Sequence, residues 1–158
     1  MARPRPQERS VARLAAVQAL YQMDLAGTDL ADILAEFQSH WIGREVEGEN
    51  YAKAEAEHFR DIAEGVVREQ RSLDPMVDAA LLNGWPLKRI ETVLRAILRA
   101  GAYELVYRKD VPARVVISEY VDVAAAFLDE EETGMVNGVL DALARSARGK
   151  EFETPAAG

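Results

Sequence analysis

Apolar residues recur every three or four positions along most of the chain, the spacing that places them on one face of an α-helix. The first such stripe follows two prolines, which keep the residues before them extended, so a helix is predicted to begin near Gln7 or Glu8. Its apolar side is formed by Leu14, Val17, Tyr21 and Leu25. Gly27 ends this segment, and Thr28 can cap the next helix. The stripe of that second helix is Leu30, Ile33, Leu34, Phe37 and Trp41.

The middle of the chain predicts a loop and two helices. The polar stretch GREVEGEN, residues 43–50, interrupts the apolar pattern and predicts the loop. A third helical stripe then runs over residues 59–73. Asp74 can cap a further helix and Pro75 suits its first position. This short helix is predicted to end near Asn83, which a glycine follows.

Two long helical stripes follow in the second half of the chain. One is predicted from about Leu87 to Tyr107 and contains Gly101, which costs about 1 kcal/mol of helix stability relative to alanine. Such a glycine indicates close packing against another backbone. The last helix carries an apolar stripe between Met135 and Leu143.

Between these two helices lies a segment that could be either helix or strand. It starts at Pro112, and its β-branched residues 115–117 would fit a strand over 114–118. The apolar spacing from Val116 to Phe127 favours a helix instead. The pattern as a whole therefore predicts an all-α domain.

The composition is that of a water-soluble globular protein, with 49 % hydrophobic and 29 % charged residues. A chain of 158 residues is expected to form one folding unit, with room for two sub-bundles. No apolar run approaches the length of a bilayer span, and the start lacks the apolar region of a signal peptide. The absence of cysteine excludes disulfides, thiolate metal sites and cysteine nucleophiles. We expect a cytoplasmic protein without a membrane partner.

The charge is distributed unevenly along the chain. The formal net charge of −8 opposes the approach of a polyanion over most of the surface. Residues 1–13 contain four arginines and one glutamate, a local charge of +3, so residues 14–158 carry −11. Nucleic-acid binding is therefore expected only around these arginines. They are Arg3, Arg5, Arg9 and Arg13.

Two interpretations of the arginines are open. Arg9 and Arg13 are one helical turn apart at the edge of the first apolar stripe, where their side chains are expected to reach solvent. They could form a solvated arm that aids solubility. They could instead pair with RNA phosphates while a nearby aromatic side chain, Tyr21, stacks on a base. In the first case Tyr21 would be a core residue.

No set of residues predicts an enzyme active site. The two histidines, His40 and His58, do not form a metal-ligand pair and are expected at or near the surface. No glycine-rich phosphate-binding motif is present. The acidic run over 129–132 could bind a hard cation, but acids before a helix also complement the positive end of its dipole. We favour the helix role and predict no catalysis, no cofactor and no metal.

The chain contains, in this order, the segments RSVARLAAVQALYQ, FRDIAEGV, ETVLRAILRAGAYEL, DVPARVVISEYVDVAAAF and MVNGVLD. Together they resemble the NusB family of bacterial transcription antitermination factors, from Arg9 to Arg145. The resemblance implies an all-α fold of about seven helices in two packed sub-bundles. We therefore expect a basic extended leader over 1–8, a helical RNA-binding domain over 9–147 and a flexible tail over 148–158.

The resemblance also implies a non-catalytic function. Members of this family bind the boxA element of nascent RNA together with NusE, the small-subunit ribosomal protein that doubles as a transcription factor. The pair joins NusA, NusG and RNA polymerase in a complex that suppresses premature termination, notably on ribosomal RNA operons.

The resemblance assigns RNA contacts to residues near both ends of the chain. The implied set is Arg9, Arg13, Tyr21, Phe127 and Glu131. Some relatives have three adjacent arginines where this chain has one, and Arg3 and Arg5 can compensate from the leader. Met135 stands where relatives often have phenylalanine, so a stacking contact becomes a thioether contact. We expect weak RNA binding by the chain alone and tighter binding with NusE.

Two other classes of function stay open at this point. Ribosomal RNA cytosine methyltransferases carry a NusB-like domain, although this chain has neither a glycine-rich cofactor domain nor a cysteine nucleophile. A protein-interaction module is the other alternative. Some relatives self-associate, and a homodimer could cover the arginines.

Overall fold

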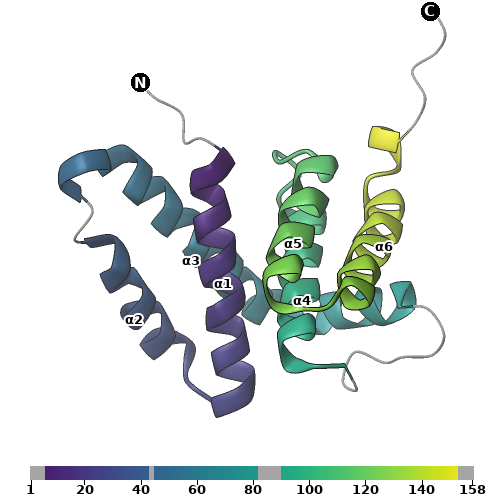
Figure 1. Cartoon of the computed structure of the whole chain (residues 1–158), viewed down its shortest axis with the longest axis horizontal. Helices are drawn as coiled ribbons and strands as arrows, with labels where there is room; N and C mark the ends of the chain where they lie inside the picture. Colours follow the sequence, from purple (N-terminus) through teal and green to yellow (C-terminus); the bar gives the residue numbers. More distant parts are fainter. Residues whose placement is uncertain (1–5, 43–44, 82–89, 153–158) are drawn as a thin grey trace, which may run out of the picture.

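The computed structural model describes residues 6–42, 45–81 and 90–152, and every regular element in these ranges is helical. Six α-helices and one 3₁₀-helix are present in this part of the chain (Figure 1). They are α1 (Pro6–Ala26), α2 (Leu30–Ile42), α3 (Glu45–Ala80), α4 (Thr92–Tyr107), α5 (Ala113–Phe127), α6 (Glu130–Ala147) and η2 (Gly149–Phe152). The predicted all-α class is confirmed, with six α-helices in the described ranges in place of about seven.

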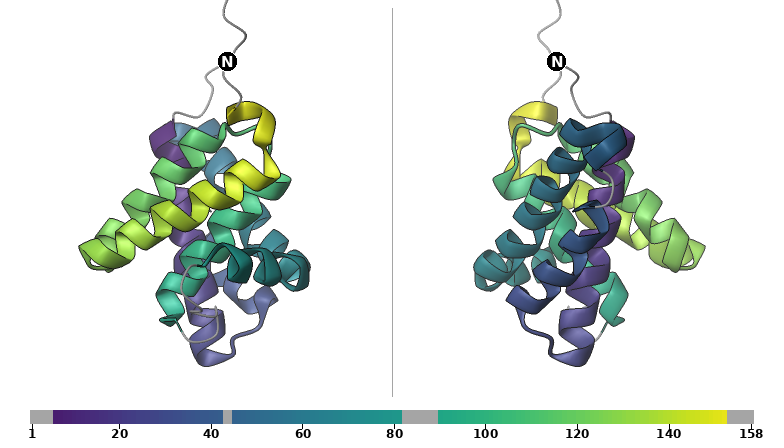
Figure 2. Two further views of the ribbon diagram at one scale, coloured as in Figure 1. Left: turned by 90° about the vertical axis from the view of Figure 1, so that its right-hand side faces the viewer. Right: turned by 90° about the vertical axis from the view of Figure 1, so that its left-hand side faces the viewer.

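The helices form two bundles that share one core. Figure 1 shows α1, α2 and α3 on one side and α4, α5 and α6 on the other, and the C-terminal part of α3 crosses behind α4 to reach α6 (Figures 1 and 2). The buried apolar side chains form a single cluster to which all six α-helices contribute. Within it, Phe37 of α2 stacks on Phe59 of α3 with ring centroids 5.4 Å apart. None of the described helices is long and apolar enough to cross a membrane.

Two predicted boundaries change in the structure. Residues 45–50, predicted as a loop, form the first turns of α3. The helix predicted from Leu87 begins at Thr92. Residues 82–89, which include the predicted stop at Asn83, lie outside the described ranges.

The helix α3 also continues through Pro75, where the sequence predicted a new helix. Leu73 and Val77 are both fully buried, and their spacing of four residues keeps one apolar stripe in phase across the proline. Asp74 caps nothing, because its carboxylate accepts two hydrogen bonds of 2.9 Å from Arg99 of α4. Burial of the stripe therefore outweighs the hydrogen bond that the proline removes.

The N-terminus of α5 is capped by a residue from η2. The helix begins directly after Pro112, and residues 115–117 are helical, so the strand alternative is wrong. Proline offers no side-chain cap, and the Glu151 carboxylate instead accepts a 3.0 Å hydrogen bond from the Ala113 N–H. This contact ties η2 to the start of α5.

Arg148 closes the junction between α6 and the end of α4. Its buried guanidinium donates to the carbonyl oxygens of Glu104, Leu105, Arg108 and Val111. A helix end leaves its last carbonyls without intrahelical donors, and Arg148 supplies them. Within the predicted flexible tail over 148–158, Arg148 is thus held in place and residues 149–152 form η2, and 153–158 lie outside the described ranges.

Two glycines allow helices to approach closely. A Cβ atom at Gly65 of α3 would lie 2.2 Å from the ring of Tyr103 on α4, closer than a side chain can be. A Cβ atom at Gly101 of α4 would lie 2.9 Å from the methyl groups of Leu140. Gly101 thus permits close packing as predicted, but its neighbour is a side chain rather than another backbone.

Gly65→Ala is expected to destabilise the protein by about 1–3 kcal/mol, because the added methyl group must displace the buried Tyr103 ring. Urea denaturation followed by circular dichroism measures the change in the free energy of unfolding. Gly138→Ala is the matched control, since nothing lies within 4 Å of its Cβ position in α6 and alanine gains about 0.5–1 kcal/mol of helix stability. A Gly65→Ala protein as stable as wild type would contradict the close approach of α3 and α4.

Candidate nucleic-acid interface

Tyr21 and Phe127, which are far apart in the sequence, line one surface pocket. Tyr21 lies on the C-terminal half of α1, and Phe127 is the last residue of α5. Their side chains are 37 % and 46 % exposed, so the alternative that Tyr21 is a core residue is wrong. The fold thus brings together the two aromatic residues that the sequence proposed for RNA.

The pocket lies where α1, the start of α4 and the end of α5 meet, and its volume is about 510 Å³. Its other lining residues are Val17, Gln18, Ile90, Glu91, Thr92 and Val93. Val17 and Ile90 are buried and form an apolar floor, whereas Gln18 and Glu91 are exposed polar residues. Aromatic walls with polar groups beside them suit a planar base, which stacks by its face and forms hydrogen bonds by its edge.

Acidic side chains lie at this pocket. Glu91 lines it, and Glu132 of α6 shares a hydrogen bond with Glu91. Burial and this hydrogen bond together raise the pKa of Glu132. Asp129 caps α6, because its carboxylate accepts a 2.8 Å hydrogen bond from the Glu132 N–H. The acidic run thus starts a helix, and the described residues include no group of three or more carboxylates and histidines arranged to hold a metal ion.

Two further predicted contacts, Glu131 and Met135, lie on α6 and do not line the pocket. Glu131 is exposed in the first turn of α6, just after the short connection that follows Phe127. Met135 lies one turn later and packs partly against the core. The first is available to a ligand, and the second offers only part of its side chain.

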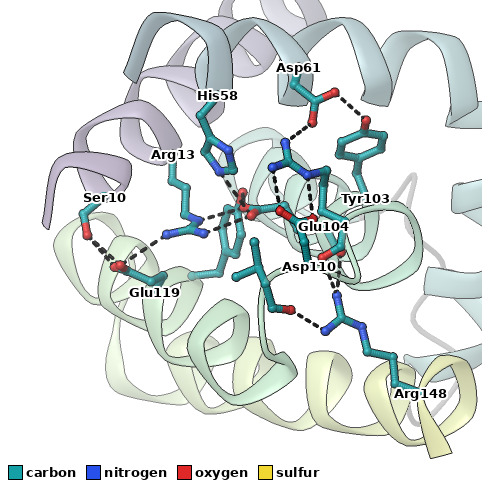
Figure 3. A network of polar contacts seen from close by, with 12 residues as sticks. Ser10, Arg13, His58, Asp61, Tyr103, Glu104, Asp110, Glu119 and Arg148 are labelled. Atoms are coloured by element: carbon teal, nitrogen blue, oxygen red, sulfur yellow. Dashed lines mark hydrogen bonds and ion pairs between the residues drawn. The ribbon is translucent and has the colours of Figure 1, made fainter. Parts of the chain in front are cut away.

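The predicted arginine contacts do not share one environment. Arg9 lies in the first turns of α1, and Arg5 lies outside the described residues. Arg13 is only 1 % exposed, so the prediction that it reaches solvent is wrong. Helices α4 and α5 pack over this edge of the α1 stripe, and the Arg13 guanidinium points into the interior toward them (Figure 3).

Arg13 forms a buried ion pair with Glu104 of α4, a side chain with no exposed surface. Arg13 Nε donates to Glu104 Oε2 at 2.8 Å, and Nη2 donates to Oε1 at 3.0 Å. The Tyr120 hydroxyl of α5 donates to Glu104 Oε2 at 2.5 Å, and His58 Nε2 of α3 lies 3.2 Å from Oε1. One carboxylate thus joins four helices.

These contacts shift the ionisation of the cluster. Burial acts to raise the pKa of Glu104, but the contacts with His58 and Arg13 outweigh it and hold that pKa at about 2. Burial and the nearby Glu104 charge raise the pKa of Tyr120 well above its usual value. Glu104 is therefore ionised and Tyr120 neutral at physiological pH. The predicted surface position of His58 is wrong, and the side chain of His40 lies outside the described residues.

The sequence pattern did not identify Gln18, Glu91 or Glu104 as candidate residues. Gln18 lies one turn before Tyr21, so it could have been found on the same helix face. Glu104 interrupts an apolar stripe between Tyr103 and Leu105, which is a sequence signal for a paired buried charge. No local signal marks Glu91, because only the packing of α4 against α1 brings it to the pocket.

Comparison with known sequences gives close relatives. The model of the NusB family matches residues 10–145. The chain is 69 % identical over 144 residues to the transcription antitermination protein NusB of Bradyrhizobium diazoefficiens, covering 91 % of this chain and 87 % of that protein. It is 65 % identical over 144 residues to the protein of the same description from Rhodopseudomonas palustris strain BisB18, covering 91 % and 85 %.

Solved structures share the fold. NusB of T. maritima matches with a TM-score of 0.75 at 31 % sequence identity, covering 98 % of this chain and 100 % of that one. A chain from the crystal structure of antitermination factors NusB and NusE in complex with dsRNA matches with a TM-score of 0.73 at 26 % identity, covering 89 % and 98 %.

Glu104→Gln is expected to destabilise the protein by about 3–5 kcal/mol at pH 7, because the Arg13 guanidinium stays buried without its counter-charge. The pH dependence follows from the lowered pKa of Glu104. Its ionic contribution is present above the usual carboxyl pKa of 4.5 and is lost as the pH falls toward about 2. Urea denaturation between pH 7 and pH 3 measures both effects.

The wild-type protein should lose stability over this acid range more steeply than the Glu104→Gln protein. Asp141→Asn is the control, since Asp141 pairs with Arg145 on the exposed face of α6 and contributes at most about 1 kcal/mol. Parallel pH profiles for wild type and Glu104→Gln would show that Glu104 is not the buried charge that the fold requires.

Proposed function

The chain belongs to the NusB family, and we propose from this premise that it binds the boxA element of nascent RNA together with NusE. It is a transcription antitermination factor. Ribosomal RNA operons are the proposed main targets. The relatives matched over nearly their whole length are antitermination proteins, which favours this function over a part of a methyltransferase.

The observation that carries the RNA proposal is the pocket between Tyr21 and Phe127. Both rings are exposed, and they lie together although the residues belong to opposite ends of the sequence. Unstacked bases of single-stranded RNA bind to such aromatic faces without requiring a particular sequence. Gln18 and Glu91 lie within reach of a base edge in the same pocket, and hydrogen bonds to that edge supply sequence preference.

The charges near the pocket support a separate site for the RNA phosphates. Glu91, Glu131 and Glu132 gather at this end of the molecule, and no described lysine or arginine lines the pocket. Phosphate contacts are therefore assigned in this proposal to the N-terminal arginines Arg5 and Arg9 and to the protein partner. Arg13 is buried and is therefore not proposed as a phosphate contact. This division supports weak binding alone and tighter binding with NusE.

Glu131 and Met135 extend the proposed surface along α6. An exposed glutamate can accept a hydrogen bond from a base amino group, whereas it would repel a phosphate, so Glu131 is proposed to face a base. Met135 adds a soft apolar contact through the exposed part of its side chain.

The proposed complex has no catalytic step. The pair of this chain and NusE joins NusA, NusG and RNA polymerase in the cytoplasm and suppresses premature termination. Self-association of the chain is a separate prediction, and light scattering with and without RNA would test whether RNA releases a dimer.

Tyr21→Ala and Phe127→Ala are each expected to weaken boxA binding roughly 5- to 150-fold, because stacking on one aromatic ring contributes about 1–3 kcal/mol per base. Fluorescence anisotropy of labelled boxA RNA and of a scrambled RNA, with and without purified NusE, measures the affinity. Tyr107→Ala is the matched control, since Tyr107 is 41 % exposed but lies at the far end of α4 from the pocket.

The wild-type chain with NusE should bind boxA RNA more tightly than scrambled RNA, and the preference should fall in the two pocket variants only. Equal binding of both RNAs would overturn the proposed function. An equal loss in the Tyr107→Ala protein would overturn the assignment of the pocket.

A further inference from the structure

A polar chain holds the start of α1 against α5. The Ser10 hydroxyl lies 2.7 Å from both Glu119 carboxylate oxygens, to which it donates, and Arg13 Nη1 donates to Glu119 Oε1 at 3.2 Å (Figure 3). The other side of the Arg13 guanidinium is engaged by Glu104. Glu119 therefore continues the buried cluster outward to the first turns of α1, and its side chain is 15 % exposed.

The Ser10–Glu119 tie lies N-terminal to the aromatic pocket on both helices, near the start of α1 and at the middle of α5. Ser10 precedes Tyr21 by eleven residues on α1, which is about 16 Å along the axis and close to three full turns, so both residues lie on one face. Glu119 precedes Phe127 by eight residues, about 12 Å, on α5. Both helices run in the same direction in Figure 1. The Ser10–Glu119 contact thus holds the first turns of α1 against the middle of α5.

We propose that Ser10 and Glu119 are positioning residues for RNA, which align the arginine-bearing start of α1 with the pocket of Tyr21 and Phe127. The inference rests on the proposed RNA function. Arg9 directly precedes Ser10 in the same turn of α1, so the tie places its backbone at a defined distance from the pocket. An RNA strand that contacts both Arg9 and the pocket then finds them already aligned. Binding therefore does not carry the entropic cost of ordering the two sites.

Electrostatics alone would give the opposite effect. Glu119 is a negative charge near the site proposed for phosphates, so its removal would strengthen RNA binding if it acted only through its field. A positioning role requires the acceptor oxygens and not the charge. The two accounts therefore predict opposite signs for the same substitution.

Ser10→Ala removes the Ser10–Glu119 hydrogen bond, retains the contacts of Arg13 with Glu104 and Glu119 and places a good helix former in α1. It is expected to weaken boxA binding about fivefold and to reduce the slope of log affinity against log salt by about 0.7, the value for one phosphate contact on a single strand. Arg9→Ala should have a similar effect. The double variant should bind no more weakly than Arg9→Ala alone, because Ser10 acts through Arg9.

Glu119→Gln and Glu119→Ala separate the acceptor from the charge. Both remove the negative charge, but glutamine keeps an oxygen that accepts from Ser10 and Arg13. Glu119→Gln should bind RNA nearly as wild type does, and Glu119→Ala should bind about fivefold more weakly. Ser39→Ala is the matched control, since Ser39 donates to a backbone carbonyl on exposed α2 and its removal should leave RNA affinity unchanged.

The measurements use the full chain with NusE, and circular dichroism melting confirms that each variant is folded. Three outcomes would overturn the positioning role: additive losses in the Ser10 and Arg9 double variant, unchanged binding by Ser10→Ala, or tighter binding by Glu119→Ala. The proposed function would stand in each case if the wild-type protein still prefers boxA RNA. Loss of boxA preference in the wild-type protein would overturn both. If Glu119→Ala does not fold, the Ser10 and Arg9 series decides.

Discussion

The buried ion pair between Arg13 and Glu104 is the interaction on which the arrangement of the helices depends. It joins the first helix of one bundle to the first helix of the other. Removing two charges from water costs several kcal/mol per ion, and the cost is offset only where the geometry is good and the remaining polar atoms are satisfied. Tyr120 and Glu119 complete this set of partners. A shift of α1 by one turn would leave a buried charge unpaired, so the pair permits one register of α1 against α4 and α5.

Helix α4 carries the other contacts that depend on this register. Its residue Tyr103 fills the space that Gly65 leaves on α3, and Gly101 accommodates Leu140 of α6. Its C-terminal carbonyls accept hydrogen bonds from Arg148. Helix α4 therefore packs closely against α3 and α6 and also accepts the hydrogen bonds of Arg148. These contacts of one central helix explain why the two sub-bundles share a single core.

The proposed RNA surface follows from the same arrangement. The pocket of Tyr21 and Phe127 exists because the C-terminal half of α1 and the end of α5 meet beside the start of α4. Acidic groups near it disfavour phosphates there and leave stacking and base-edge contacts as the favourable interactions. Arg9, which is proposed to bind the RNA backbone, lies instead in the first turns of α1. The proposal therefore assigns two different kinds of RNA contact to one helix.

The sequence by itself determined the helical class, most helix positions and the two aromatic residues of the pocket, because these depend on periodicity and on motifs that are local in the chain. Only the tertiary structure decided that Arg13 is buried, since a residue at the edge of an apolar stripe is exposed or buried according to the helix that packs beside it. The same reason applies to Asp74 and Pro75, which locally predict the start of a new helix. In the structure Asp74 pairs with Arg99, and a continuous buried stripe carries α3 through Pro75. The burial of Arg13 and the course of α3 thus depend on residues that are distant in sequence, and hydrophobic periodicity does not reveal such contacts.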